Sequence, residues 1–152
     1  MRLLGKKFPR KRKVSFCHGV FDVLHPGHLR HIAFAKKKAD ILIVSLTADR
    51  YIEKGKYRPH IPEDIRALNL SYIDMVDYVI IDDNRTPIRN LKIIKPDFYA
   101  KGYEYSKIKG ETLNKDTLEE IKTVKSYGGK FLFTPGDIVY SSTELLKISK
   151  PK

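Results

Sequence analysis

One stretch decides the fold of this chain: Cys17-His18-Gly19-Val20-Phe21-Asp22-Val23-Leu24-His25-Pro26-Gly27-His28. It follows the apolar run Val14 to Phe16, which is typical of a buried strand, and its Pro26 and Gly27 open a run of helix formers. A strand, a glycine turn and a helix in this order direct backbone N–H groups and the positive end of the helix dipole at one spot. We therefore expect an anionic group to bind there.

Two histidines lie where this predicted helix begins. His25 and His28 are three residues apart, so on a helix they share a face and both rings can direct N–H donors at the same anion. The alternative is that they are ordinary surface or capping histidines. The strand, turn and helix around them favour the binding interpretation.

The composition is that of one globular domain. The chain has 152 residues, of which 41% are hydrophobic and 32% charged, and it contains no apolar run long enough to cross a membrane. Its basic start lacks the apolar stretch of a secretory signal, and its single cysteine, Cys17, excludes internal disulfides and fits a reducing compartment. We expect a soluble, cytoplasmic protein in which Cys17 is a buried small hydrophobe and not a nucleophile.

The net charge of +12 is concentrated at the start of the chain. Seven basic residues precede the first acidic one, Asp22, and removing them from the 30 basic residues leaves 23 against 18 acidic ones, a net charge of +5. We expect residues 1–12 to form a basic arm and residues 13–149 to form the domain. The arm has one aromatic residue, Phe8, so a solvated arm or a partner contact is favoured over RNA binding.

Strand-like and helix-like segments alternate along the whole chain. Periodicity and turn residues predict strands at 13–17, 41–46, 78–81, 98–100 and 130–134, and helices at 26–38, 62–71, 86–94, 116–127 and 142–149. The predicted fold is α/β: a Rossmann-like, doubly wound, five-stranded parallel sheet with helices on both faces. A right-handed crossover places the turn from Gly19 to His28 at the carboxyl edge of the sheet, where ligands bind, and residues 54–62 are predicted to form a loop over that site.

Hydroxyl-bearing residues precede the last predicted helix. Ser141, Ser142 and Thr143 could form a second phosphate cradle, but plain N-capping of that helix is the alternative.

Several cations are candidate charge clamps. Lys54, Lys56 and Arg58 lie in the predicted loop and Arg66 on the helix after it, whereas Lys101 directly follows a strand, which is where ligands bind. For the loop cations, simple solvation is the alternative.

Asp22 lies within the glycine turn, and three roles are open to it: holding backbone N–H groups, orienting a ligand hydroxyl, or lying near a magnesium ion. His18 and His31 flank the histidine pair, but no carboxylate or thiolate completes a tetrahedral zinc set. We therefore expect no metal held by protein ligands.

The sequence lacks a Ser-His-Asp arrangement, an adjacent carboxylate pair and an obvious general base. An attacking phosphate monoester needs no base, because its second pKa near 6 leaves it largely dianionic at neutral pH. A site that aligns such a phosphate with the α-phosphorus of a nucleoside triphosphate, and neutralises charge with imidazole, lysine and magnesium, would catalyse nucleotidyl transfer.

The stretch Gly19 to His28 closely resembles the hallmark Gly-x-Phe-Asp-x-x-His-x-Gly-His of the cytidylyltransferase-like nucleotidyltransferase superfamily. Residues 101–105 resemble its Lys-Gly-x-Asp-Tyr segment and residues 141–143 its Ser-Thr-Thr phosphate signature, so the similarity covers about residues 13–149. It is strongest to the nucleotidyltransferase domain of ADP-heptose synthases. The resemblance implies catalytic roles for His25, His28 and Lys54, and nucleotide binding by Gly19, Val20, Phe21, Asp22, Arg66, Lys101, Ser141, Ser142 and Thr143.

The resemblance also implies the substrates. The chain lacks the arginine and glycine that glycerol-3-phosphate cytidylyltransferases carry before their Ser-Thr-Thr signature, so ATP is favoured over CTP. Glu104 replaces an aspartate and Ser142 a threonine, which indicates that the acceptor pocket and the phosphate contacts can differ from those of a heptose enzyme. The predicted reaction transfers AMP to the phosphate of a sugar or polyol phosphate and releases pyrophosphate, with Mg²⁺ carried by the triphosphate. The alternatives are CMP transfer like that of glycerol-3-phosphate cytidylyltransferases, and a non-catalytic nucleotide-sensing or RNA-binding module.

Expected partners are the nucleoside triphosphate and the sugar or polyol phosphate, without a membrane or nucleic acid. A homodimer, and a place as one module of a longer bifunctional protein, remain open.

Overall fold

The computed structural model describes residues 12–53, 55, 57–102 and 113–136. Its five strands all run parallel in one sheet with the order β3-β2-β1-β4-β5. The strands are β1 (Val14–Gly19), β2 (Ile41–Thr47), β3 (Tyr78–Asp82), β4 (Phe98–Lys101) and β5 (Lys130–Phe133), and the helices are α1 (Pro26–Lys36), α2 (Glu63–Ser71), α3 (Ile88–Ile94) and α4 (Lys115–Ser126). The predicted Rossmann-like parallel fold is confirmed.

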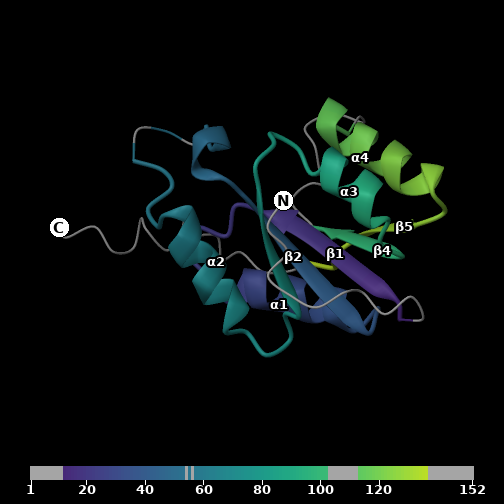
Figure 1. Ribbon diagram of the computed structural model, residues 1–152, viewed down its shortest axis with the longest axis horizontal. Coiled ribbons are helices and arrows are strands. Elements are labelled where there is room, and N and C mark those ends of the chain that lie inside the picture. The colour runs from purple at the N-terminus through teal and green to yellow at the C-terminus, as the bar shows by residue number, and fades with distance from the viewer. Residues whose placement is uncertain (1–11, 54, 56, 103–112, 137–152) are drawn as a thin grey trace.

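Helices cover both faces of the sheet, as the doubly wound prediction requires. Figure 1 shows α1 and α2 on one side of the strands and α3 and α4 on the other. Two apolar clusters fill the spaces between these layers. One joins Ile32 of α1 and Leu70 of α2 to β2, and the other joins Leu91 of α3 and Val124 of α4 to the opposite face.

Local sequence signals account for the element boundaries. All residues of β2 are buried, as its continuous apolar run indicates for a central parallel strand. Asn114 caps α4 by accepting a hydrogen bond of 2.8 Å from the N–H of Thr117, and Gly128 follows the helix with a φ of 83° that favours glycine. The sequence did not predict the 3₁₀ turn Asp49–Tyr51 between β2 and α2.

Two predictions fall on residues whose structure is almost wholly undescribed, and a third is affected at two positions. The last helix, at 142–149, lies wholly outside the described residues, and so does the predicted arm apart from Arg12. The predicted loop 54–62 is described except at Lys54 and Lys56.

Cys17 is fully buried in β1, and burial raises the pKa of its thiol to about 12. It packs as a small hydrophobe, as expected. No helix in the described part of the chain is long and apolar enough to cross a membrane.

Candidate active site

The histidine turn lies at the point where the strand order reverses. β1 is paired with β2 on one side and with β4 on the other, so the chain builds the sheet outward to β3 and then crosses back past β1. The turn that follows β1 therefore opens at the carboxyl edge between two oppositely wound halves. In open α/β sheets, ligands bind at this position.

His25 is the N-cap of α1, and its ring orientation is fixed by the cap. Its Nδ1 accepts a hydrogen bond of 3.1 Å from the backbone N–H of Gly27. Because Nδ1 acts as an acceptor, the proton of the neutral ring is on Nε2. His25 is 9% exposed, so the cap places one ring N–H donor at a largely buried helix start.

The side chains of the two histidines with predicted catalytic roles, His25 and His28, contact each other. The ring centroids of His25 and His28 are 3.8 Å apart with an angle of 30° between the planes, and the ring of Phe21 packs on His28 at 5.2 Å. Phe21 has a φ of 51°, a left-handed conformation that turns the chain sharply at this point. The turn and the helix start thus form one packed aromatic unit, and capping and ligand binding are compatible roles for His25.

Gly19 allows this packing because it carries no side chain. A Cβ at this position would lie 3.2 Å from Cε2 of Phe21, closer than an ordinary contact. The glycine of the motif therefore makes room for the Phe21 ring, which in turn contacts His28.

Asp22 holds backbone N–H groups, the first of its three predicted roles. Its side chain is 2% exposed and accepts hydrogen bonds from the N–H groups of His60 and Ile61 and from Nδ1 of His60, with Nε of Arg58 at 3.1 Å. Burial by itself raises the pKa of Asp22, but the hydrogen bonds from His60 and Ile61 and the charge of Arg58 outweigh it, so the net shift is downward. Asp22 is ionised at neutral pH.

Arg66 is 1% exposed and donates to atoms of the protein itself. Nη1 bonds the carbonyl oxygens of Val20 and Thr47 at 2.6 and 3.0 Å, Nε bonds the carbonyl of Ile61 at 2.9 Å, and Nη2 bonds a carboxylate oxygen of Asp49. The resemblance implied that Arg66 is a nucleotide contact. The structure joins its guanidinium to three parts of the chain: Val20 in the turn, Thr47 and Asp49 at and just after the end of β2, and Ile61 before α2.

Lys101, at the end of β4, is 8% exposed and forms an ion pair of 2.5 Å with Glu120 of α4, which also accepts a hydrogen bond of 3.1 Å from the hydroxyl of Tyr99. Burial raises the pKa of Glu120, although Lys101 and Tyr99 oppose the shift. The predicted charge clamp thus lies at the carboxyl edge of the sheet, and part of its charge is neutralised by a buried carboxylate.

A polar network that the sequence patterns did not predict lies next to the turn. His18, at the end of β1, exchanges hydrogen bonds with the hydroxyls of Ser45 and Thr47 at 3.0 and 3.2 Å. Burial, aided by the charge of Lys101, lowers the pKa of His18 to about 3, so its ring is neutral at physiological pH. Polar residues within or just after apolar strands, such as Ser45 and Asp82, are the signal that could have revealed this network.

The other histidine beside the motif, His31, also has a structural partner. Its Nδ1 lies 2.5 Å from the hydroxyl of Thr134, and burial lowers its pKa to about 4. Lys54, Ser141, Ser142 and Thr143 lie outside the described residues, so their positions relative to the histidines stay predictions. Among the described residues, no group of three or more His, Cys, Asp or Glu side chains is arranged to hold a metal ion.

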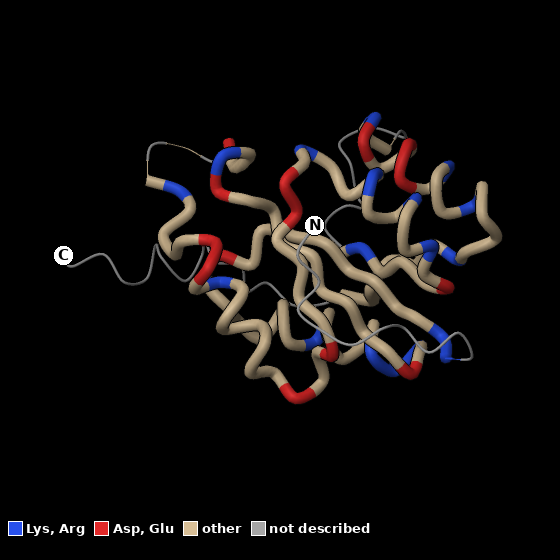
Figure 2. Tube along the Cα trace, in the orientation of Figure 1, with Lys and Arg blue, Asp and Glu red and all other residues tan. Residues whose placement is uncertain are grey.

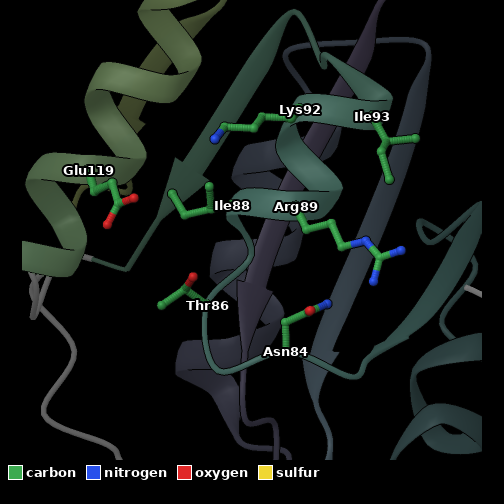
Figure 3. Close-up of a pocket in the computed structure, with 7 residues that line it drawn as sticks. All are labelled: Asn84, Thr86, Ile88, Arg89, Lys92, Ile93 and Glu119. Atoms are coloured by element: carbon green, nitrogen blue, oxygen red, sulfur yellow. The ribbon is translucent and has the colours of Figure 1, made fainter.

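A separate groove of about 500 Å³ lies on the α3 and α4 side of the sheet. Figure 3 shows its lining, with Arg89, Lys92 and Ile93 from α3 and Glu119 from α4. It contains none of the predicted site residues. Figure 2 shows Lys and Arg residues interspersed with Asp and Glu residues along the described chain.

Together, a switch-point turn, a histidine pair at a helix start and a lysine at the adjacent strand end define an α/β protein whose sheet edge suits a phosphate-bearing ligand. A family model with the description "Cytidylyltransferase-like" matches residues 16–148, and the chain belongs to this family of nucleotidyl-transferring enzymes.

Several bifunctional proteins named HldE are similar to the chain. The protein of Campylobacter concisus is 40% identical over 123 residues, which are 79% of this chain and 25% of that protein, and the protein of Wolinella succinogenes is 37% identical over 80% of this chain and 26% of its own length. The chain thus spans about a quarter of the curated relatives that it matches.

Solved structures show the same fold. The lipopolysaccharide core biosynthesis protein of Thermoplasma volcanium aligns with a TM-score of 0.68 and 25% identity over 84% of this chain and 99% of that chain. Pantoate-beta-alanine ligase of Francisella tularensis aligns with a TM-score of 0.56 and 17% identity over 91% of this chain and 69% of that chain, a likeness of fold alone.

Proposed function

We propose that this chain transfers AMP from ATP to the phosphate of a sugar or polyol phosphate and releases pyrophosphate. The observation that carries the proposal is the stacked pair of His25 and His28 at the start of α1, on the carboxyl edge of the sheet. Membership of the cytidylyltransferase-like family and similarity to the HldE proteins support the same reaction class.

The proposed chemistry requires positioning more than proton transfer. An oxygen of the acceptor phosphate, largely dianionic at neutral pH, forms a bond to the α-phosphorus as the bond from that phosphorus to the bridging oxygen of the β-phosphate breaks. The electron pair leaves with pyrophosphate. The Nε2–H of His25, the ring of His28 and the N–H groups of the first turn of α1 would stabilise the charge that develops on the phosphates.

Mg²⁺ would enter with the triphosphate in this proposal. The motif carboxylate, Asp22, already accepts hydrogen bonds from His60 and Ile61 and lies beside Arg58, which makes it a poor additional ligand for a cation. Bound in this way, the metal would neutralise charge on the phosphates and orient them.

ATP is proposed over CTP on the sequence around Ser141-Ser142-Thr143, which lacks the arginine and glycine of the cytidylyltransferase signature. Because the HldE relatives are about four times longer than the matched region, we also propose that this domain works beside a second activity, on the same chain or on a separate one.

Pyrophosphate release is the direct test. The protein is incubated with each of four nucleoside triphosphates and a panel of sugar 1-phosphates and polyol phosphates, with Mg²⁺ present. We expect turnover with ATP that depends on one acceptor and falls by about 10² to 10³ in His28→Ala, by analogy with the loss of an oxyanion donor. Asn69→Ala, on the exposed side of α2, is the matched control.

Three results would overturn the proposal. Turnover with CTP alone would assign CMP transfer. Tight nucleotide binding without turnover for any acceptor would assign a sensor. Salt-dependent RNA binding that disappears on deletion of residues 1–12 would assign an RNA-binding module.

A further inference from the structure

The segment before α2 is bonded to the histidine turn through the backbone N–H and the carbonyl oxygen of Ile61. The N–H of Ile61 donates to Oδ1 of Asp22 at 3.0 Å, and the carbonyl oxygen of Ile61 accepts from Nε of Arg66 at 2.9 Å. Arg66 also bonds the carbonyl of Val20, two residues before Asp22. The turn and the segment are therefore closed into a ring by two buried charged side chains, which we call the Ile61 clamp.

The carboxylate of Asp22 has little capacity left for a ligand. The backbone N–H of His60 lies 2.9 and 3.0 Å from its two oxygens, Nδ1 of His60 lies 3.0 Å away, and Nε of Arg58 lies at 3.1 Å. With the N–H of Ile61, three donor groups make four hydrogen bonds to a carboxylate that offers about four lone-pair positions, and the Arg58 cation lies beside it. A metal ion or a ligand hydroxyl would have to displace one of these donors.

The guanidinium of Arg66 is occupied in the same way. Its bonds to Val20, Thr47, Ile61 and Asp49 use all but one of its N–H groups, and the side chain is 1% exposed. A nucleotide phosphate could reach this group only if the clamp opened.

The clamp acts on the part of the turn that contacts a predicted catalytic ring. Arg66 and Asp22 hold the residues on either side of Phe21, whose left-handed backbone directs its ring against His28 at 5.2 Å. We propose that Asp22 and Arg66 are positioning residues, not nucleotide or metal contacts: the Ile61 clamp fixes the turn, and through Phe21 it fixes the imidazole of His28. The link to catalysis rests on the proposed function, whereas the clamp itself does not.

The first test measures hydrogen exchange of the free wild-type protein. The amides of His60 and Ile61 should be protected in the absence of any nucleotide, and Asp22→Asn should speed their exchange by about tenfold or more, because an amide nitrogen now faces the backbone donors. Asp64→Asn, an exposed carboxylate on α2, is the matched control and should leave both amides unchanged. Unprotected amides in the wild type would overturn the clamp, whether or not the protein catalyses transfer.

The second test separates positioning from ligand contact in Asp22→Asn and Arg66→Lys. A positioning role predicts that kcat falls by about 10²-fold, as for a small displacement of a catalytic group, while the Mg²⁺ concentration at half-maximal rate stays within about twofold. Arg66→Lys should lose activity even though it keeps the positive charge, because lysine lacks the planar guanidinium that bonds several carbonyl groups at once.

Two outcomes would overturn the positioning roles. A shift of the Mg²⁺ midpoint by about tenfold or more in Asp22→Asn would make Asp22 a metal contact. A rise in the KM for ATP with unchanged kcat in either variant would make that residue a nucleotide contact. Absence of transfer by the wild type would instead overturn the proposed function and leave the exchange result standing.

Discussion

Substitutions of His25 should separate its two roles, as helix cap and as phosphate donor. His25→Ala removes both the acceptor of the Gly27 N–H and the Nε2–H donor. His25→Asn keeps a good N-cap, because asparagine is among the preferred residues at that position, but its shorter amide leaves no donor where Nε2 lies. The pair of variants therefore differs in the cap and shares the loss of the imidazole.

The magnitudes follow from these contacts. Loss of an N-cap costs about 1 kcal/mol, which for a domain of this size lowers Tm by about 3 °C. Loss of one preorganised donor to a developing negative charge costs about 3 to 4 kcal/mol, or about 10² to 10³ in kcat. We expect His25→Ala to lose both stability and activity, and His25→Asn to lose the same activity with Tm within about 1 °C of the wild type.

Thermal unfolding followed by circular dichroism gives the first quantity, and pyrophosphate release at saturating ATP gives the second. If His25→Asn retains activity within threefold of the wild type, a difference of about 0.7 kcal/mol, His25 does not act as a phosphate donor. The reasoning about the cap fails if the two variants have equal Tm values.

Three further predictions concern the surroundings of the site. Lys101→Met should destabilise the fold by about 3 to 5 kcal/mol in urea, because it leaves the buried Glu120 without its cation, and adding Glu120→Gln should recover most of that loss; a double variant as unstable as the single one would contradict this. Burial raises the pKa of Asp82 above 3.8 despite its hydrogen bonds, so the folded state binds that proton more tightly and stability falls as the pH rises from 3.8 through the folded pKa. In Asp82→Asn the free energy of unfolding, measured by urea titration at successive pH values, should fall less steeply over this pH range than in the wild type. An equally steep fall in the variant would refute the assignment to Asp82. Gly129→Ala should destabilise the fold by about 1 to 3 kcal/mol, since its Cβ would lie 2.6 Å from a ring carbon of Tyr127 and 2.9 Å from the backbone oxygen of Pro96. Gly128→Ala has nothing within 4 Å of its Cβ and should cost about 1 to 2 kcal/mol through its φ of 83° alone. Equal losses in the two variants, together with a Gly129→Ala loss that does not change when the contacting Tyr127 side chain is shortened, would argue against the steric account.

The clamp offers an explanation for a motif carboxylate that has no obvious chemical role. In the described structure, the hydrogen bonds of Asp22 and Arg66 go to other groups of the protein. In the proposed role, the two charged side chains fix the conformation of the turn. Preorganisation of this kind is what a reaction that relies on phosphate alignment requires.

The parallel sheet, the order of its elements and the place of the histidine turn could all be predicted from local patterns. The apolar run of β2, the glycines after α4 and the Pro-Gly pair that opens α1 act within a few residues of where they stand, so a linear reading detects them. The sequence also predicted that His25 and His28 lie on one face at the helix start, because they are three residues apart, whereas the contact between their rings and the extended N-cap backbone of His25 came from the structure.

The partners of the charged residues required the folded chain. Arg66 bonds a carbonyl 46 residues earlier, Asp22 bonds amides 38 and 39 residues later, and Lys101 pairs with a carboxylate 19 residues on, in a different helix. Such pairs depend on which loops and strand ends meet at one edge of the sheet and on how much water is excluded there. Residue type and spacing along the chain reveal neither of these. Local periodicity therefore identified the histidines as candidate donors, whereas the packing of distant segments assigned Asp22 and Arg66 their internal hydrogen bonds.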